Sequence, residues 1–278
     1  MLEATLRHDI TSLVANEFKA QTFPSISASW VISNEEFWNV DMPVNYLKLR
    51  GSWGQNGSVN NLVGGADQFN LVNSLDGNLI TVEGVTGIEV ANIPNANLIW
   101  ETSEQVDIGL DLRAFNNRLT FSADWSQKLT KDVIIDDGAL VTPPSAGDEI
   151  SEFNGGTIQN QGLEFDLGWQ HTTDSGFSYG INVNLSTLKN EVTDIINVPE
   201  GSFIEGYSIP TGPAITRFEE GHPVWYFYGY ETDGVDSETG FLNIVDLNED
   251  GIIDSNDKTN IGSPHPDILY GANLDLLR

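Results

Sequence analysis

Apolar and polar residues alternate with a period of two along several stretches of the chain. From Val106 to Leu112 every second residue is apolar, and the residues between them are Asp or Gly. Residues 119–126 repeat the alternation. The intervening stretch 115–118 contains two Asn residues, which tolerate the positive φ of a tight turn. The pattern therefore predicts a β-hairpin.

A second hairpin is predicted further along the chain. Alternation runs through residues 163–170 and 177–186, with a polar turn at residues 173–176 between them. Weaker alternation marks four further stretches, and residues 34–42 form at most a helical turn. Together these stretches predict an all-β chain of about eight strands. The weaker stretches are 2–8, 23–33, 45–54 and 267–276.

The predicted connections alternate between short and long. Short links lie near residues 116 and 174 and a medium link lies at 34–45, whereas three other links are far longer. An antiparallel up-and-down transmembrane β-barrel has short turns at one end and long extracellular loops at the other. Five Trp residues at the expected strand ends resemble the aromatic girdle of such a barrel. They are Trp30, Trp53, Trp100, Trp125 and Trp169. The long links are roughly 56–96, 131–156 and 190–266.

A soluble antiparallel sandwich with its apolar face inward has the same alternation and remains the alternative. In the barrel, the apolar set faces lipid and the neighbouring carboxylates face the opposite side, because a register slip of one residue would expose those carboxylates to lipid. The outward set is Val106, Ile108, Leu110, Leu112, Leu163, Phe165, Leu167 and Trp169. The opposite set is Asp107, Asp111, Glu164 and Asp166.

The charge of the chain narrows the function classes. The 278 residues include 12 Lys and Arg against 41 Asp and Glu, a formal net charge of −29. This charge repels phosphates and so excludes nucleic acid as a partner, whereas it favours divalent cations and neutral ligands. There is no Cys, and no run approaches the ~18 apolar residues that a membrane helix needs. No secretory signal follows Met1.

Seven stretches, in order along the chain, resemble SusC/RagA-type TonB-linked outer-membrane transporters. One of them is Leu47-Lys48-Leu49-Arg50-Gly51-Ser52-Trp53-Gly54, and another is Ile261-Gly262-Ser263-Pro264-His265-Pro266-Asp267. The resemblance covers almost the whole chain. The other five stretches are 22–33, 97–111, 116–119, 156–165 and 227–230.

The resemblance implies a barrel of about 22 strands in the Gram-negative outer membrane, with a plugged lumen. It also implies import of glycans or peptides, a SusD-like lipoprotein lid, and energy from TonB–ExbB–ExbD acting through an N-terminal plug. Residues 1–278 resemble a single, partial barrel domain. We therefore expect a fragment, with the plug and signal peptide absent from the chain.

Residues 246–257 match a calcium-binding loop. Oxygen ligands recur at loop positions 1, 3 and 5, Gly251 at position 6 permits a sharp turn, and position 7 offers a backbone carbonyl. Position 12 is Asp rather than the Glu of the usual EF-hand, and no flanking helices are predicted. The loop resembles those of dockerins. The alternative is a solvated acidic turn. The predicted Ca²⁺ ligands are Asp246, Asn248, Asp250, Ile252, Asp254 and Asp257.

An aromatic run offers a second, weaker candidate site. Its rings could stack on sugar rings, but the preferred interpretation is a barrel strand whose alternate aromatic residues face lipid or the girdle. The four His residues show no metal-binding spacing, and no catalytic motif is present, so no enzyme is predicted. The alternative function is a soluble secreted calcium-binding β-sandwich, as an adhesin or glycan-binding module. The candidate ligand-binding residues are Trp225, Tyr226, Tyr228 and Tyr230.

Overall fold

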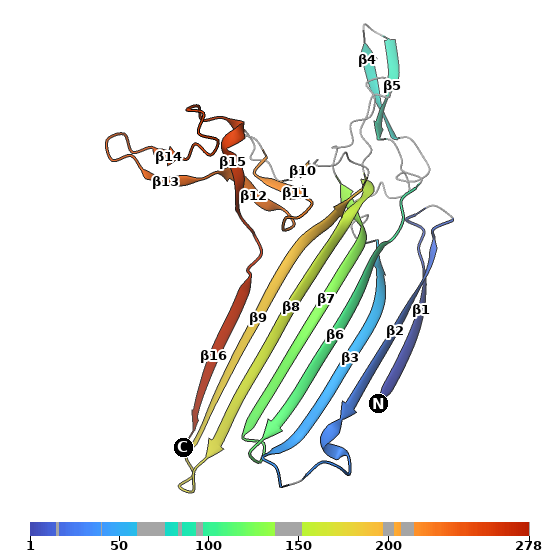
Figure 1. Ribbon diagram of the computed structural model, residues 1–278. Coiled ribbons are helices and arrows are strands. Elements are labelled where there is room, and N and C mark those ends of the chain that lie inside the picture. The colour runs from blue at the N-terminus through green and yellow to red at the C-terminus, as the bar shows by residue number, and fades with distance from the viewer. Residues whose placement is uncertain are drawn as a thin grey trace.

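An eight-stranded antiparallel sheet forms most of the molecule (Figure 1). The structure is a computed structural model that describes residues 1–14, 17–39, 41–59, 76–82, 85–92, 97–136, 152–196, 203–206 and 214–277. Each strand of this sheet pairs with the strand of the sheet that comes before or after it in the sequence, which is up-and-down topology. The strands in spatial order are β1 (Leu2–Ile10), β2 (Ala20–Val31), β3 (Val44–Ser58), β6 (Glu101–Ala114), β7 (Leu119–Asp136), β8 (Glu152–Thr172), β9 (Ser178–Ile195) and β16 (Ile268–Leu277).

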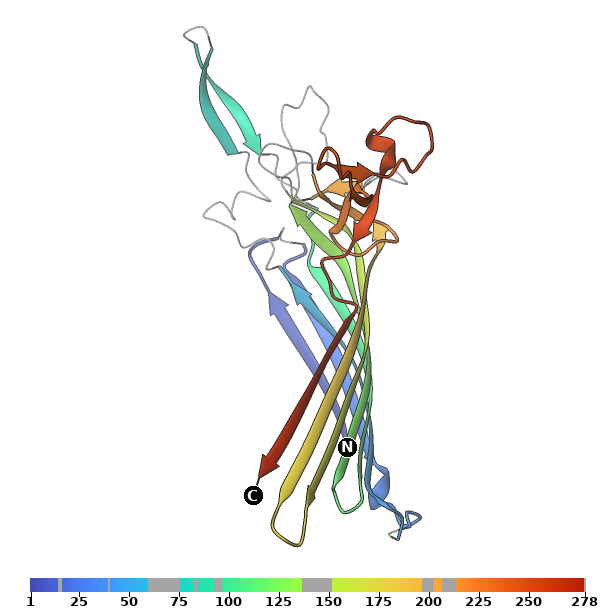
Figure 2. The same cartoon turned by 90° about the vertical axis from the view of Figure 1, so that its left-hand side faces the viewer.

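The two ends of the sheet differ, as the sequence predicts. At one end, the turn end, the strands join through the tight turns at 115–118 and 173–177 and through a longer link that contains the 3-10 helix η1 (Ile32–Asn34). Phe115, Asn116 and Asn117 all have positive φ, as the first hairpin requires. All the long connections lie at the opposite end, the loop end (Figures 1 and 2). The alternation of short and long connections is therefore confirmed.

The register of the sheet separates two faces. One cross-strand row runs through Leu47, Leu112, Phe121, Leu167, Val183 and Ala272, and the next through Trp30, Leu49, Leu110, Ala123, Phe165, Leu185 and Tyr270. Because side chains alternate across a strand, these rows share one face. All eight residues predicted to face outward lie on it, and Asp107, Asp111, Glu164 and Asp166 lie on the other. Both predictions are confirmed.

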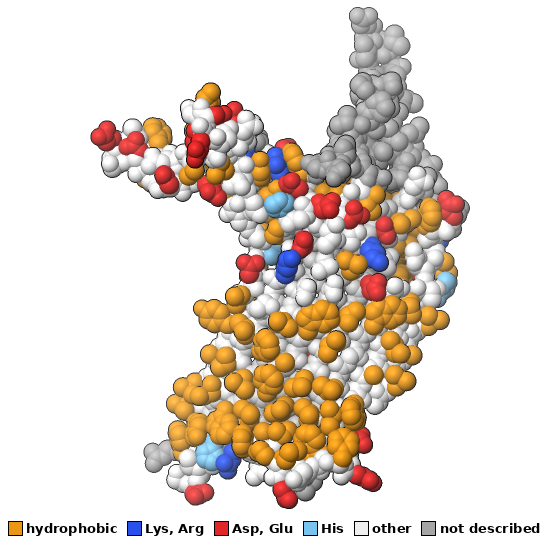
Figure 3. Space-filling model, in the orientation of Figure 1, with side chains coloured by type: hydrophobic (Ala, Val, Ile, Leu, Met, Phe, Trp, Pro, Cys, Tyr) orange, Lys and Arg blue, Asp and Glu red, His pale blue; other side chains and the backbone are white. Residues whose placement is uncertain are grey.

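Figure 3 shows the apolar face as a continuous band toward the turn end. The band stops partway along the strands: on β8, Leu163 is its last member before Gln161 and Gln159 take over the same face. Among the residues that the structure describes, no second sheet covers it, since Leu163 and Leu167 are 41% and 46% exposed. The sandwich alternative, which needs this face buried between packed sheets, is wrong.

The buried core lies at the loop end. One cluster joins Val14, Phe23, Leu98, Trp100 and Ile134. A second joins Val133, Ile135, Phe153, Val192, Ile204 and Phe218. Trp100 is therefore not a member of an aromatic girdle, because its ring packs edge-on against Phe23 and its Nε1 donates to the Phe18 carbonyl at 2.9 Å. Trp53 and Trp125 also lie within strands rather than at their ends, since β3 and β7 continue beyond the apolar band.

The long connections contain strands that the sequence pattern did not predict. A hairpin pairs β4 (Asp76–Val82) with β5 (Val85–Asn92). The last long connection folds into a separate lobe, the C-terminal lobe (203–206 and 214–262). Its four-stranded sheet contains β10 (Phe203–Glu205), β11 (Thr216–Glu219), β12 (Tyr226–Tyr230) and β15 (Lys258–Gly262). A hairpin of β13 (Thr232–Val235) and β14 (Leu242–Ile244) and a 3-10 helix η3 (Ser255–Asp257) complete it.

The C-terminal lobe is hydrogen-bonded to the loop end of β9. Val192 donates to the His222 carbonyl and accepts from Gly221, both at 2.8 Å. The Asn190 side chain accepts from the Val224 N–H at 2.7 Å. These bonds hold the lobe beside the last long strand before β16. None of the helices in the described ranges is long or apolar enough to cross a membrane.

Candidate functional site: polar face and acidic loop

An ion cluster lies at the centre of the polar face. The Arg50 guanidinium lies 2.6 Å from an Asp124 carboxylate oxygen and 3.3 Å from one of Asp111. Register places Arg50 opposite Gly109, which in turn pairs with Asp124, so the long Arg side chain extends over a position without a side chain. The cluster carries two carboxylates for one guanidinium and so remains negative.

Short polar side chains surround this cluster. A hollow of about 480 Å³ opens beside it on the polar face. There Asp107 accepts hydrogen bonds from the Ser52 hydroxyl at 3.0 Å and from the Gln105 amide at 2.9 Å. The hollow offers hydroxyl and amide groups to a neutral polar ligand and contains one basic side chain, Lys128. Its lining includes Thr5, Ser25, Ser27, Ser52, Ser103 and Gln105.

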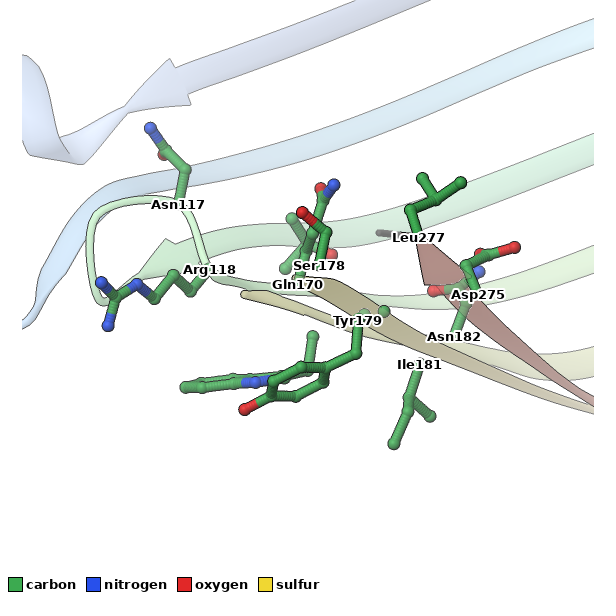
Figure 4. Close-up of a pocket in the computed structure, with 13 residues that line it drawn as sticks. Asn117, Arg118, Gln170, Ser178, Tyr179, Ile181, Asn182, Asp275 and Leu277 are labelled. Carbon is green, nitrogen blue, oxygen red and sulfur yellow. The ribbon is translucent and has the colours of Figure 1, made fainter. Parts of the chain in front are cut away.

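A second hollow, of about 250 Å³, lies at the turn end beside Arg118. Figure 4 shows that Ser178 and Leu277 point to one side of the sheet, whereas Tyr179 and Ile181 point to the other. This agrees with the register, in which Tyr179 follows Ser178 on the opposite face. The residues that line the hollow thus belong to both faces, and they do not enclose a single site.

The acidic loop 246–257 forms the turn that the calcium motif predicts. Gly251 has a φ of +83°, a conformation that L side chains rarely adopt, and its N–H donates to Asp246 Oδ2 at 2.8 Å. Asp250 Oδ1 accepts from the Ile252 N–H at 2.8 Å. The structure also places the 3-10 helix η3 at the end of the loop itself, where the Asp254 side chain accepts a hydrogen bond from the Asn256 N–H. The sequence pattern had indicated no helix there.

Asp257 anchors the loop from within. Its side chain is fully buried and accepts backbone N–H groups from Asp254 at 2.8 Å and Leu247 at 2.9 Å. These bonds hold the pKa of the Asp257 carboxyl below its ordinary value, and the bond from Asp254 has the largest effect. Burial of the carboxyl opposes this shift. Oδ1 of Asp246 is also buried, and it accepts no hydrogen bond among the described residues.

The predicted metal ligands are therefore gathered in one loop, but most of them bond to the loop itself. Asn248 and Asp250 bond to one another's side chains at 3.0 Å, and Ile252 is exposed. Within the described ranges, no group of three or more His, Cys, Asp or Glu side chains stands ready to hold a metal ion. A bound cation would compete with the backbone N–H groups of Ile252 and Asn256 for the carboxylates of Asp250 and Asp254.

The aromatic candidates occupy different environments in the C-terminal lobe. Tyr226 is 1% exposed, stacks on His222 with ring centroids 4.4 Å apart, and donates its hydroxyl to Glu219. Burial and this bond raise the Tyr226 pKa. Trp225 packs against Phe218, and Tyr230 lies under Lys258. The guanidinium of Arg217 stacks on Tyr228 at 3.3 Å from its ring centroid. Each of the four rings already has a neighbour, and Tyr226 is part of the core of the lobe.

Two of these features were not predicted from the sequence. The Arg50 cluster had a signal, because Lys and Arg are scarce and the alternation puts Arg50, Asp111 and Asp124 on polar positions of three strands. Only the register shows that those positions are adjacent. Arg217 gave no signal, since it precedes the aromatic run and its stacking depends on β11 pairing with β12.

Comparison with known proteins agrees with this architecture. The TonB-dependent receptor P3 of Formosa agariphila is 30% identical over 293 residues, covering 98% of this chain and 28% of that protein. SusC of Bacteroides thetaiotaomicron is 27% identical, covering 96% of this chain and 27% of that protein. The chain thus spans just over a quarter of the length of these relatives.

Solved structures share the fold. The RagAB peptide transporter matches with a TM-score of 0.77 at 23% identity, covering 98% of this chain and 29% of that one. The RagAB peptide importer in its "open-open" state matches with a TM-score of 0.76. The family described as TonB dependent receptor-like, beta-barrel, matches residues 1–243. The apolar band, the up-and-down topology and these matches lead to one conclusion: the chain belongs to the TonB-dependent receptor β-barrel family and is of the SusC/RagA type.

Proposed function

We propose that this chain forms part of the wall of an outer-membrane barrel in a Gram-negative bacterium, and that the whole receptor imports glycans or peptides. The apolar band carries this proposal. Its cross-strand rows give a smooth apolar face suited to lipid, while the polar face opposite suits a wet lumen. The unpaired outer edges of β1 and β16 are then completed by further strands of the barrel, because exposed strand edges tend to pair.

Transport, rather than a catalysed reaction, is the activity proposed for the receptor. Energy would come from TonB–ExbB–ExbD, acting through an N-terminal plug, and capture would involve a SusD-like lipoprotein on the extracellular side. The names of the relatives support both partners, since they include TonB-dependent receptors, SusC and the RagAB peptide transporter. The loop end is then extracellular and the turn end periplasmic.

The polar face favours a neutral substrate. Near Arg50 it carries Asp107, Asp111 and Asp124, with Lys48 opposite Asp111 in the register and Lys128 in the same hollow as Asp107, within a chain of net charge −29. Such a wall repels anions and offers hydroxyl and amide groups to glycans or uncharged peptides. Growth assays test the function: deletion of the full-length gene should abolish growth on one class of oligosaccharide or peptide as the limiting nutrient.

Plasmid-borne wild-type gene is the control and should restore growth, and deletion of tonB should reproduce the defect. If the deletion strain grows normally on every glycan and peptide that supports the parent strain, nutrient import is not the role of this receptor. If it fails only on anionic substrates, the charge argument is wrong while the transport function remains.

We also propose that the acidic loop binds one Ca²⁺ ion. Two features support it: the turn at Gly251, and the buried Asp246 oxygen without a hydrogen bond. Residues 231–257 contain nine Asp or Glu and no Lys or Arg, and a divalent cation would relieve their mutual repulsion while ordering the loop. The ligands would be Asp246, Asn248, Asp250, Asp254 and Asp257, with the Ile252 carbonyl.

Calorimetric titration of the full-length receptor with Ca²⁺ tests this site. The Asp250→Ala variant should lose the binding heat of one site, whereas Glu238→Ala, which removes an exposed carboxylate outside the loop, should keep it. Identical heats and affinities for the wild type and Asp250→Ala would exclude the site.

A further inference from the structure

A belt of aromatic side chains borders the apolar band at the turn end. Phe115 packs against Trp169 with ring centroids 6.1 Å apart. Tyr179 packs against both His171 and Phe177, at 5.6 Å and 6.4 Å. The register places Trp169, His171 and Tyr179 on the apolar face of the sheet. These five residues, the turn-end belt, therefore continue the apolar band to its margin.

A basic side chain lies at the same margin. The Arg118 carbonyl accepts a hydrogen bond from the Gln170 N–H at 2.8 Å, which fixes Arg118 beside the segment of β8 that carries Trp169. Figure 4 shows the Arg118 side chain extending past the ends of the strands, whereas Asn117 points to one side of the sheet. Figure 3 shows a basic side chain beside a histidine where the band ends.

Three hydrogen-bond donors in this region have no partner within the part of the chain that the structure describes. Among the described arginines, only Arg118 has a guanidinium without a hydrogen bond, an ion pair or a ring contact. The Trp169 Nε1–H and the Tyr179 hydroxyl also have no hydrogen-bond partner there. By contrast, Trp53 and Trp100 each donate the indole N–H to a protein oxygen.

These groups suit the boundary between lipid tails and headgroups. In the proposed barrel wall, lipid tails cover the apolar band, and further strands add at the edges of β1 and β16 rather than over the outer face of β7 to β9. Aromatic side chains at the margin of such a band lie at the level of the headgroups. A guanidinium donates to phosphate oxygens with a matching fork geometry, and Trp and Tyr present polar donors from an apolar ring.

The surrounding charge indicates which headgroup fits. Asp174 is exposed in the turn between β8 and β9 and adds a carboxylate at the same end of the sheet, within a chain of net charge −29. One guanidinium with a carboxylate at the same end is complementary to one phosphate that carries an ammonium group. A headgroup with several negative charges would be repelled.

We propose that Arg118, together with the Trp169 and Tyr179 donors, binds the phosphate of a zwitterionic phospholipid in the membrane leaflet at the turn end. This inference rests on the proposed function, which places the outer face of the sheet in lipid. The guanidinium, the indole N–H and the phenol hydroxyl all donate to the phosphate oxygens, while the lipid tails continue along the apolar band.

Native mass spectrometry of the detergent-solubilised full-length receptor tests the proposal, with phosphatidylethanolamine as the probe. The wild type should retain one such molecule under activation that removes diacylglycerol with the same chains. Arg118→Ala should lower the retained fraction by about fivefold. Trp169→Phe, which keeps a ring without its N–H, should lower it by about threefold. Arg113→Ala is the matched control and should retain lipid as the wild type does, because Arg113 is an exposed arginine near the same end of the sheet but on the polar face.

The possible contrary results separate the site from the function on which it rests. Equal retention by the wild type and Arg118→Ala, or diacylglycerol held as firmly as phosphatidylethanolamine, overturns the phosphate site but leaves the lipid-facing band standing. Firmer retention of phosphatidylglycerol refutes the zwitterionic headgroup. Inorganic phosphate bound without lipid, and lost in Arg118→Ala, identifies free phosphate as the ligand and refutes the proposal. A wild type that retains no lipid of any kind overturns the proposal and counts against the barrel wall itself.

Discussion

Replacing Leu167 by Arg places a charge at the centre of the apolar band. On β8 the apolar set extends from Leu163 to Trp169, about 20 Å at about 3.3 Å per residue. A strand tilt of about 40° reduces this to about 15 Å across the membrane, which lies within the ~25 Å apolar band of such barrels. Leu167 lies inside this set, where an outward Arg costs up to about 2–4 kcal/mol.

Asn184→Arg is the matched control, because Asn184 lies on the polar face beside the row that contains Leu167. It pairs with Asp166 across β8 and β9, so the new charge meets a carboxylate and costs at most about 1 kcal/mol. The measurement is the urea midpoint of the full-length receptor in lipid vesicles, followed by the electrophoretic shift between folded and unfolded barrel. The midpoint should fall for Leu167→Arg and stay nearly constant for Asn184→Arg. Equal shifts for both variants would refute the assignment of faces.

Three further predictions concern local packing and pH. Gly162→Ala would bring a Cβ within 2.6 Å of the Thr187 carbonyl oxygen, and it should lower the free energy of unfolding by about 1–3 kcal/mol in the same urea assay. Gly180→Ala is the control and should leave it unchanged, because the nearest atom to a Cβ there is 3.7 Å away. Tyr226→Phe removes the buried hydroxyl that donates to Glu219 and should destabilise the C-terminal lobe by about 1–2 kcal/mol, seen as faster amide exchange in β11 and β12; unchanged exchange would contradict this role. Because the pKa of Asp257 is lowered, its ionised carboxylate stabilises the acidic loop above the ordinary carboxyl pKa of about 3.9, and this stabilisation is lost as the pH falls through the lowered value. Pepsin should therefore cut within residues 246–257 faster at about pH 2 than at about pH 4, with both rates measured relative to a peptide standard. Equal relative rates at the two pH values would count against this role of Asp257.

The main sheet was largely predictable because one physical requirement governs each of its strands. Lipid on one side and water on the other impose a period of two, and a turn such as 115–118 fixes the register of its hairpin. Alternation in β6 and β7 therefore specified both the strands and the face of Leu110 or Asp111. Strand ends were less predictable, since β8 continues from the apolar band to Glu152 without the alternation: Gly and polar residues there are interrupted only by Phe153 and Ile158.

The C-terminal lobe was not predictable for the opposite reason. Its strands have only three to five residues, too few for a periodicity to emerge from the surrounding loop. The burial of Tyr226 depends on contacts with His222 and Glu219 that form only after β11 and β12 pair. The acidic loop is an exception, because its turn depends on local spacing around Gly251 that is visible in the sequence. The Arg50 cluster was predictable in part. The sequence places its three residues on polar positions of their strands, but only the register of the sheet shows that they are adjacent.

The assignment of a lipid face and a lumen face is tested most directly by a spin-label scan of β8 in the full-length receptor embedded in its membrane. Single labels at each position from Leu163 to Trp169 would be measured for collisions with oxygen, which concentrates in lipid, and with a water-soluble nickel complex. Labels at the odd-numbered positions should collide with oxygen, and labels at the even-numbered positions with nickel, so that the two profiles alternate out of phase. Profiles without a period of two, or odd-numbered positions shielded from both reagents, would contradict the barrel wall.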